Sequence, residues 1–503
     1  MNNRLVLRHL GHFAWVGGTF MMPAATWAVY FREWHVLTAF MMSIAFCLLV
    51  GLILSTLGRA KPGGDRPGMR HREALGLVGL SWILAAALGA LPYILAGVLE
   101  PIDALFESMS GFTTTGSSVM TDIEGTAKGI LFWRSFTHWL GGMGIIVLFV
   151  AVLPYLGAGG KLLFKSEAPG PDPKGLRPRI KDTASVLYKI YLGLTVIETV
   201  ALMAAGMTFY DALCHTFGTL ATGGFSTRQA SIGAFDSVAV ELIIIFFMVC
   251  AGSNFGLYFN MLRGNRKAPW HDTEWRVYIL LLVGCTVLVT VNLLVPQHEA
   301  SIATTASQPA PDTPAYSPAN ALRYAAFQVV SIMTTTGYCT ADFDAWPHFS
   351  RMLLVVLMFI GGSAGSTGGG MKVVRIILLA KIAYHHLDTT FRPKMVRAIR
   401  INGQVVGDEN QRTIYGFFIL YLMWFVGGIL VMSVMGLPFQ TAATSVAATL
   451  NNIGPGLDAV GATMDYHLVP AAGKLFLTLC MVLGRLELFS ICVLFVPAFW
   501  RKD

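Results

Sequence analysis

The sequence has little charge for its length. Asp, Glu, Lys and Arg make up 13% of its 503 residues, whereas apolar residues make up 54%. Because a soluble domain carries about 25% charged residues, this balance excludes a soluble globular protein and a disordered one. A bilayer core about 30 Å thick needs roughly 20 residues per helix, and the apolar residues suffice for about ten such helices. We therefore expect an integral membrane protein.

Motifs for metals, disulfides and enzymatic chemistry are also missing. The seven cysteines form no CxxC pair, which argues against a disulfide framework and a zinc site. The glycine-rich run at 361–372 is not a phosphate-binding loop, because Met371 separates Gly370 from Lys372 and Val373 stands where Ser or Thr is needed. No recognisable pair of nucleophile and base indicates hydrolysis. We expect neither an enzyme nor a cofactor.

Apolar stretches long enough to cross a bilayer recur along the chain. We predict ten spans, at 11–31, 36–57, 74–98, 129–154, 184–207, 237–262, 277–296, 350–380, 414–436 and 472–499. The first is expected to be a retained anchor, because its apolar region is longer than that of a signal peptide.

The basic residues indicate the topology. Lys and Arg follow every even-numbered span, whereas the loop from Pro296 to Pro318 contains neither. Because basic loops stay on the cytoplasmic side, both termini are predicted to be cytoplasmic. Topology accounts for the net charge of +8, so no nucleic-acid partner is required.

An internal repeat lies in the odd-to-even connections. Four glycine motifs follow spans three, five, seven and nine: FTTTGSS at 112–118, LATGGFS at 220–226, MTTTGYC at 333–339 and NNIGPGL at 451–457. Each unit reads as span, short helix, glycine loop, span, and two crossings per unit give all copies one orientation. We predict an all-α membrane protein with two N-terminal spans in 1–58 and four pseudo-symmetric repeats at 71–155, 181–263, 272–381 and 412–500.

These four loops are predicted to form a selectivity filter. Non-helical backbone at membrane depth must be buried or wetted, and rings of carbonyls replace the water around a cation in potassium channels. The short helices would aim their partly negative C-terminal ends at the path and favour cations. The predicted potassium ligands are the carbonyls of Thr114, Thr115, Gly116, Ala221, Thr222, Gly223, Thr335, Thr336, Gly337, Asn452, Ile453 and Gly454.

The eighth span carries six glycines within residues 361–370. A continuous helix here would be about 6 kcal/mol worse than its alanine equivalent, so we predict an intramembrane loop that obstructs the path below the filter. Close helix packing through small residues is the alternative. The predicted gate residues are Gly365, Ser366, Thr367, Gly368, Gly369, Gly370, Lys372 and Arg485.

Several polar residues in the spans allow two interpretations. Arg485 lies near the middle of the last span, and its partner is either the carbonyls of the glycine loop or an acid on another span. Glu107 either adds negative potential near the filter or forms buried hydrogen bonds. Four further residues serve either structure or coupling to protons or sodium: His138, Glu198, His215 and Glu241.

Five segments together resemble the Trk/Ktr/HKT superfamily, and specifically the bacterial Trk and Ktr potassium-uptake membrane subunits. They are ESMSGFTTTGSS at 107–118, FWRSFTHWLGGMG at 132–144, LATGGFST at 220–227, GGSAGSTGGGMK at 361–372 and NNIGPGL at 451–457. The resemblance covers nearly the whole chain. The two extra N-terminal spans favour the Trk-type, TrkH-like branch.

The resemblance implies a potassium-uptake protein in the bacterial inner membrane. It implies a homodimer with one potassium path per protomer. We also expect that rubidium passes through the filter and that membrane lipid surrounds the protein. It also implies a cytoplasmic, nucleotide-binding regulatory subunit of the Trk type. Channel-like transport and symport with protons or sodium both stay open. The alternative functions are a cation-coupled secondary transporter of an organic solute, for which inverted repeats would be typical, and a membrane enzyme.

Overall fold

The computed structural model describes residues 3–59, 71–142, 144, 180–295, 316–393, 398–486 and 488–500. Within them the chain is almost entirely helical, and the one sheet is the hairpin of β1 (Arg400–Ile401) and β2 (Gln404–Val405). The ends of the predicted fourth span and of the first repeat, and most of the loop at 296–318, lie outside the described residues. The all-α fold class is confirmed.

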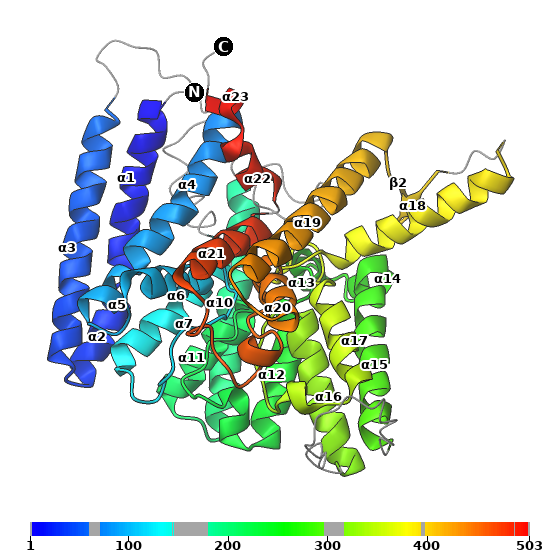
Figure 1. The fold of residues 1–503 in the computed structure, drawn as a ribbon, viewed down its shortest axis with the longest axis horizontal. Helices are drawn as coiled ribbons and strands as arrows, with labels where there is room; N and C mark the ends of the chain where they lie inside the picture. Colours follow the sequence, from blue (N-terminus) through cyan, green and yellow to red (C-terminus); the bar gives the residue numbers. More distant parts are fainter. Residues whose placement is uncertain are drawn as a thin grey trace.

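Three N-terminal helices form a layer at one side of the molecule (Figure 1). They are α1 (Asn3–Thr19), α2 (Met22–Tyr30) and α3 (Trp34–Leu57), and α1 packs along α3. The predicted span at 11–31 is therefore two helices. Pro23 lies in the first turn of α2, and proline has no amide hydrogen to continue the hydrogen bonds of α1.

Each repeat has a long outer helix, a short pore helix and an inner helix. The outer helices are α4 (His71–Gly89), α10 (Ile180–Ala204), α15 (Thr273–Leu294) and α19 (Asp408–Val434). The pore helices are α6 (Pro101–Phe112), α11 (Phe209–Leu220), α16 (Pro318–Met333) and α20 (Phe439–Leu450). The inner helices are α7 (Lys128–Gly142), α12 (Val238–Ala251), α17 (His348–Met358) and α21 (Ala471–Arg485).

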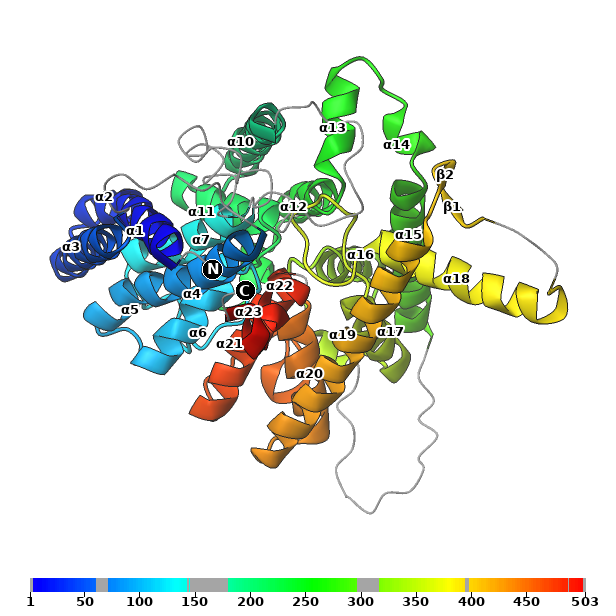
Figure 2. The ribbon, with the colours of Figure 1, turned by 90° about the horizontal axis from the view of Figure 1, so that it is seen from above.

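The repeats are arranged in a closed ring. The inner helix of each repeat contacts the pore helix of the next: α7 with α11, α12 with α16, α17 with α20, and α21 with α6. Seen from above, the four pore helices surround the middle of the molecule (Figure 2). The four predicted units thus share one axis, which inverted repeats would not produce.

Shorter elements connect these helices. The remaining α-helices are α5 (Leu91–Leu95), α13 (Phe255–Leu262), α14 (Ala268–His271), α18 (Val373–Phe391), α22 (Phe489–Cys492) and α23 (Pro497–Trp500). The 3-10 helices are η3 (Ser231–Phe235), η4 (Phe343–Ala345), η5 (Asp458–Val460) and η6 (Val493–Phe495).

Local sequence explains where the pore helices begin. The hydroxyls of Thr208 and Ser317 cap α11 and α16 by accepting from amides in their first turns, and Pro101 and Pro318 stand at first helical positions. These residue types are preferred there, since proline lacks the amide that would otherwise go unpaired. The pore helices are therefore fixed at their outer ends by sequence-local signals.

The inner helices are broken more often than the sequence predicts. Among the described residues, five helices are long and apolar enough to span, or six if α12 and α13 count as one. The expectation of a continuous sixth span at 237–262 is wrong, because α12 and α13 meet at 91°. Asn254 ends the first segment by capping α13 through the amide of Gly256, 2.8 Å away. The tenth span also breaks, at Arg485.

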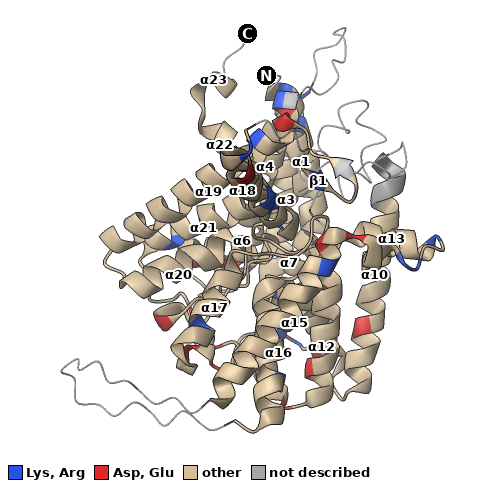
Figure 3. Ribbon diagram, turned by 90° about the vertical axis from the view of Figure 1, so that its right-hand side faces the viewer, with Lys and Arg blue, Asp and Glu red and all other residues tan. Residues whose placement is uncertain are grey.

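The outer surface suits a bilayer. Charged residues are sparse along most of the helical body (Figure 3), and large apolar side chains such as Leu280 of α15, which is 70% exposed, point outward. Exposed apolar surface on this scale marks a membrane or partner interface. The two ends of the chain lie at the same end of the molecule (Figure 1).

Candidate ion pathway

Four equivalent loops, which we call the filter loops, follow the pore helices at 113–116, 221–224, 334–337 and 451–454. The residue after each helical cap has a left-handed φ: Thr114 at 53°, Thr222 at 56°, Thr335 at 60° and Asn452 at 54°. Two residues later a glycine again has positive φ: Gly116 at 83°, Gly224 at 79°, Gly337 at 79° and Gly454 at 105°. This shared backbone gives the four loops one register.

The register corrects the prediction for the second loop. We aligned Gly223 with the other glycines, but the structure aligns Gly224, because Ala221 is the cap of α11 as Thr113 is the cap of α6. Ala221 thus belongs to the helix end, and Gly223 corresponds to Thr115. A signal was present in the sequence: Asp211 precedes Gly224 by 13 residues, and Asp103 precedes Gly116 by 13.

The four filter loops contact one another in cyclic order. A Cβ atom built on Gly116 would overlap the carbonyl oxygen of Gly223, one on Gly224 that of Thr336, and one on Gly337 that of Ile453. A Cβ on Gly454 would lie 2.9 Å from the carbonyl oxygen of Thr115. The fourth filter loop therefore contacts the first, and the four loops form a closed ring. Glycine is needed at these four positions for both its positive φ and its lack of a side chain.

Four carbonyl oxygens, which we call the ring carbonyls, therefore come together: those of Thr115, Gly223, Thr336 and Ile453. The amides of these residues donate to pore-helix carbonyls at 2.8–2.9 Å. Across the described residues, no hydrogen bond reaches the ring carbonyls, although all four residues are buried. Buried carbonyls normally have partners, so these oxygens are available to a ligand.

A cavity of about 80 Å³ opens beyond the ring, and the glycines of all four filter loops line it. The other end of the ring faces the C-terminal ends of the pore helices, which carry partial negative charge. In the described part of the chain, no group of three His, Cys, Asp or Glu side chains could hold a metal ion.

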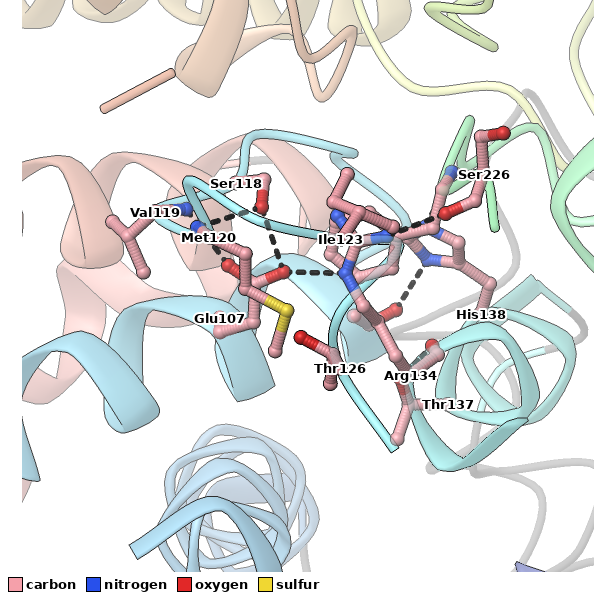
Figure 4. Close-up of polar contacts among 12 residues, drawn as sticks. Glu107, Ser118, Val119, Met120, Ile123, Thr126, Arg134, Thr137, His138 and Ser226 are labelled. Atoms are coloured by element: carbon pink, nitrogen blue, oxygen red, sulfur yellow. Dashed lines mark hydrogen bonds and ion pairs between the residues drawn. The ribbon is translucent and has the colours of Figure 1, made fainter. Parts of the chain in front are cut away.

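Charged side chains support the filter from behind (Figure 4). Arg134 of α7 donates to Glu107 of α6 at 2.6 Å and to the carbonyl of Ser226 at 3.0 Å. Glu107 also accepts from the hydroxyl of Ser118 and the amide of Val119. This network satisfies Glu107 fully and favours its structural interpretation. Nothing in the sequence paired Arg134 with Glu107, since 27 residues separate them.

The other uncertain polar residues differ in their surroundings. Glu241 of α12 forms an ion pair with Arg323 of α16 at 2.5 Å, which supports a structural role. The ring nitrogens of His215 contact the carbonyl of Asp211 and the hydroxyl of Ser226. The carboxyl oxygens of Glu198 are buried, with no hydrogen-bond partner among the described residues.

The glycine-rich stretch of the third repeat forms an irregular loop, residues 359–372, between α17 and α18. We call it the intramembrane loop after its predicted position. The loop runs directly beneath the filter. A Cβ on Gly368 would lie 3.1 Å from the carbonyl of Thr334, and one on Gly369 would lie 2.5 Å from that of Asn451. The amide of Gly369 donates to the hydroxyl of Thr335 at 2.7 Å.

The second repeat holds the intramembrane loop from the side. The amide of Ser363 donates to the carbonyl of Gly252 at 2.8 Å, and the amide of Phe255 donates to the carbonyl of Gly365 at 3.1 Å. The hydroxyl of Thr367 donates to the carbonyl of Ala251 at 3.2 Å. The loop thus occupies the bend between α12 and α13, which explains why the sixth span cannot be straight.

Three charged side chains fix the intramembrane loop. Arg485 donates to the carbonyl of Thr367 at 2.8 Å and to that of Gly141, at the end of α7, at 2.7 Å. The expected contact between Arg485 and the loop is therefore present. The ammonium of Lys372 donates to the carbonyl of Gly368.

Glu274 of α15, which the sequence did not single out, accepts from Ala364 at 2.8 Å and Val374 at 3.0 Å. It lies 90 residues before Ala364, so only the fold brings them together.

Comparisons with known proteins agree with this geometry. Residues 40–502 match the TrkH family model, described as "Cation transport protein". The Trk system potassium uptake protein TrkH of Halomonas elongata is 40% identical, with all of both chains covered. The TrkH protein of Escherichia coli is 39% identical, with 96% of each chain covered.

A solved structure is similar as well. The crystal structure of the potassium transporter TrkH from Vibrio parahaemolyticus matches with a TM-score of 0.84 and 36% sequence identity, covering 100% of both chains. The family match spans most of the sequence, and both relatives are aligned over nearly their whole lengths. This chain therefore belongs to the TrkH family of cation transport proteins.

Proposed function

We propose that this protein takes up potassium through a filter made by its four filter loops. The observation that carries the proposal is the set of four buried ring carbonyls, one from each repeat, which accept no hydrogen bond from the described residues. Relatives of the same length are named potassium uptake proteins. The protein is a transporter and not an enzyme, and potassium is its transported ion.

The ring carbonyls replace part of the hydration shell of the ion. The preceding carbonyls, of Thr114, Thr222, Thr335 and Asn452, and the carbonyls of Gly116 and Gly224 beyond complete the coordination. The carbonyl of Gly454 already accepts from the hydroxyls of Ser117 at 3.0 Å and Tyr466 at 2.8 Å. Rubidium, close to potassium in size, also passes. Discrimination against sodium is weaker than in channels with several stacked carbonyl rings.

The intramembrane loop is the gate. Residues 365–370 lie between the filter and the inner helices, and they must move aside before an ion can leave the filter. Lys372 and Arg485 hold the closed position through backbone carbonyls. Because α18 follows the loop directly and extends away from the helical body (Figure 1), a partner that moves α18 would move the loop.

That partner is the cytoplasmic nucleotide-binding subunit of the Trk system. The protein lies in a bacterial inner membrane with both termini in the cytoplasm, and lipid covers its exposed apolar helices. Two copies form a homodimer with one path each. Within each copy the repeats extend over 71–155, 181–263, 272–381 and 412–500. The basic loops and the shared position of the chain ends support this orientation.

Flux into proteoliposomes tests the filter. The purified protein should pass potassium and rubidium, and sodium measurably more slowly, with no requirement for an organic solute. The same protein should restore growth of a potassium-uptake-deficient bacterium at low potassium. No potassium flux from correctly folded protein would refute the proposal. A proton or sodium gradient that drives potassium uphill would decide between symport and channel-like transport.

A further inference from the structure

The ring residue is anchored differently in different repeats. In the first and third repeats it is a threonine whose hydroxyl meets the hydroxyl of the threonine that caps the pore helix. Thr115 contacts Thr113 at 2.8 Å, and Thr336 contacts Thr334 at 2.8 Å. Both capping hydroxyls donate to helix carbonyls, at 2.6 and 2.8 Å, so each ring threonine donates to its cap. A side chain thus ties the ring residue to its own pore helix.

The second repeat has neither threonine. Ala221 is the helix cap and Gly223 is the ring residue. Gly223 is not among the residues with positive φ, so backbone conformation does not require a glycine there. The space beside it is occupied instead. A Cβ on Gly223 would lie 2.5 Å from Cγ and 2.6 Å from Nδ1 of His138, which belongs to the inner helix of the first repeat.

His138 makes two hydrogen bonds in this position (Figure 4). Its Nε2 accepts from the amide of Phe225 at 3.2 Å, and its Nδ1 lies 2.8 Å from the carbonyl of Gly111 in α6. Because an amide only donates and a carbonyl only accepts, Nδ1 carries the proton and the ring is neutral. The imidazole is buried and lies 4.1 Å from the ring of Phe225.

We propose that His138 is a positioning residue that takes the place of the missing threonine pair in the second filter loop. It holds the Gly223 carbonyl in the ring from behind and connects that loop to the first pore helix. Gly223 is a glycine because it leaves room for the imidazole. This inference rests on the proposed filter, because it assigns His138 an effect on the discrimination between potassium and sodium.

Selectivity should depend on His138 because the second filter loop, which forms one wall of the ring, becomes free to move when the imidazole is removed. Sodium is smaller than potassium, so it is excluded only while the carbonyls cannot close around it. Removing the imidazole leaves the amide of Phe225 without its acceptor and leaves a void beside Gly223. The second wall can then move, and sodium flux should rise relative to potassium flux.

Three substitutions separate the hydrogen bonds of His138. His138→Gln places an acceptor near the position of Nε2 and keeps the bond to Phe225. His138→Asn reaches only the position of Nδ1 and keeps the bond to Gly111. His138→Ala keeps neither. The ratio of sodium to potassium flux in proteoliposomes should rise roughly tenfold for Ala and Asn, the effect of one unpaired buried donor, and much less for Gln.

A double-mutant cycle tests the space argument. Gly223→Ala should disturb selectivity when His138 is present, because the new methyl group overlaps the imidazole. In the His138→Ala background the same methyl group fills the void, so it should move selectivity back toward the wild type. Coupling of this kind, with a change of sign, is expected only for residues in direct contact.

The outcomes distinguish this inference from the proposed filter. If Gly116→Ser changes selectivity while all His138 variants retain the wild-type ratio, the filter stands and the role of His138 is refuted. If neither position changes the ratio, the filter proposal fails as well. Gel filtration reports folding, and should His138→Ala not fold, equal ratios for the Gln and Asn variants would refute the inference.

Discussion

The filter loops and the intramembrane loop are both non-helical segments at membrane depth, yet they are built in opposite ways. Each filter loop is short, and its shape comes from its own backbone: a left-handed residue, a ring carbonyl and a glycine, repeated four times. The intramembrane loop occurs once. Side chains of its own repeat, Glu274 and Thr335, hold it together with Arg485 of the fourth repeat and backbone carbonyls of the second.

This difference separates permeation from control. The site on the axis is formed by backbone carbonyls from all four repeats, and the contacts that anchor each filter loop differ between repeats. The intramembrane loop, by contrast, is held by a few hydrogen bonds with charged side chains. It can move to a second position once those hydrogen bonds are lost. Substitutions in the filter loops should therefore reduce transport, whereas substitutions around the intramembrane loop should increase it.

The largest effect is expected for Gly337→Ser. The serine would adopt φ near 79° and its Cβ would overlap the carbonyl of Ile453. The left-handed backbone alone costs roughly 1–2 kcal/mol, and displacement of the ring carbonyl adds to it, so we expect at least a roughly tenfold loss of potassium uptake in growth rescue and flux.

Gly436→Ser is the matched control. Gly436 also has positive φ, 89°, but no atom lies within 4 Å of its built Cβ. Gly436→Ser should introduce a similar backbone strain but leave potassium uptake at the wild-type level. An equal loss in both variants would mean that strain, and not the ring, explains the defect.

An effect of the opposite sign is expected for Arg485→Ala. The guanidinium holds the loop to the end of α7, and each hydrogen bond from a charged group contributes about 1.5–3 kcal/mol. Its loss should raise potassium flux roughly tenfold in proteoliposomes that lack the regulatory subunit. Arg485→Lys, with fewer donors, should fall between. Reduced flux from well-folded Arg485→Ala would contradict the assignment of the loop as a gate.

The smallest change is expected for Glu274→Gln. One oxygen of Glu274 accepts from the amide of Ala364 within the loop and from the amide of Val374 in the first turn of α18, and an amide oxygen can still accept, though more weakly. Flux should rise about twofold to threefold. Asp272→Asn is the control, because Asp272 caps the same helix through the amide of Trp275 and, among the described residues, makes no hydrogen bond with the loop. Equal effects of both variants would show that helix capping alone is responsible.

The structural features that depend on local sequence could be predicted. Apolar length, glycine spacing and basic loops indicated the fold class and the four repeats, and the glycine-rich stretch indicated a break below the filter. The register of the second loop was missed because two adjacent glycines, Gly223 and Gly224, serve different purposes. The sequence shows both as glycine, and only the helix end at Ala221 distinguishes them.

Long-range packing was not predictable. The bend after α12 arises because the intramembrane loop fits into it, and the two segments are more than 100 residues apart. The contacts of Arg134 with Glu107, and of Glu274 with the loop, likewise join residues that no periodicity relates. The partner of Arg485 could be named because a guanidinium within a membrane span needs acceptors, and a broken helix supplies free carbonyls.

The bend between α12 and α13 has a mechanical consequence. The amide of Phe255 donates to the carbonyl of Gly365 at this bend. If the intramembrane loop moves away, that amide of the second repeat loses its acceptor, and an empty space is left in the wall of the ion path. Water that enters this space would accept a hydrogen bond from the amide of Phe255 and so lower the free energy of the conducting state. The bend that holds the intramembrane loop thus also provides a hydrated exit for the ion once the loop has moved.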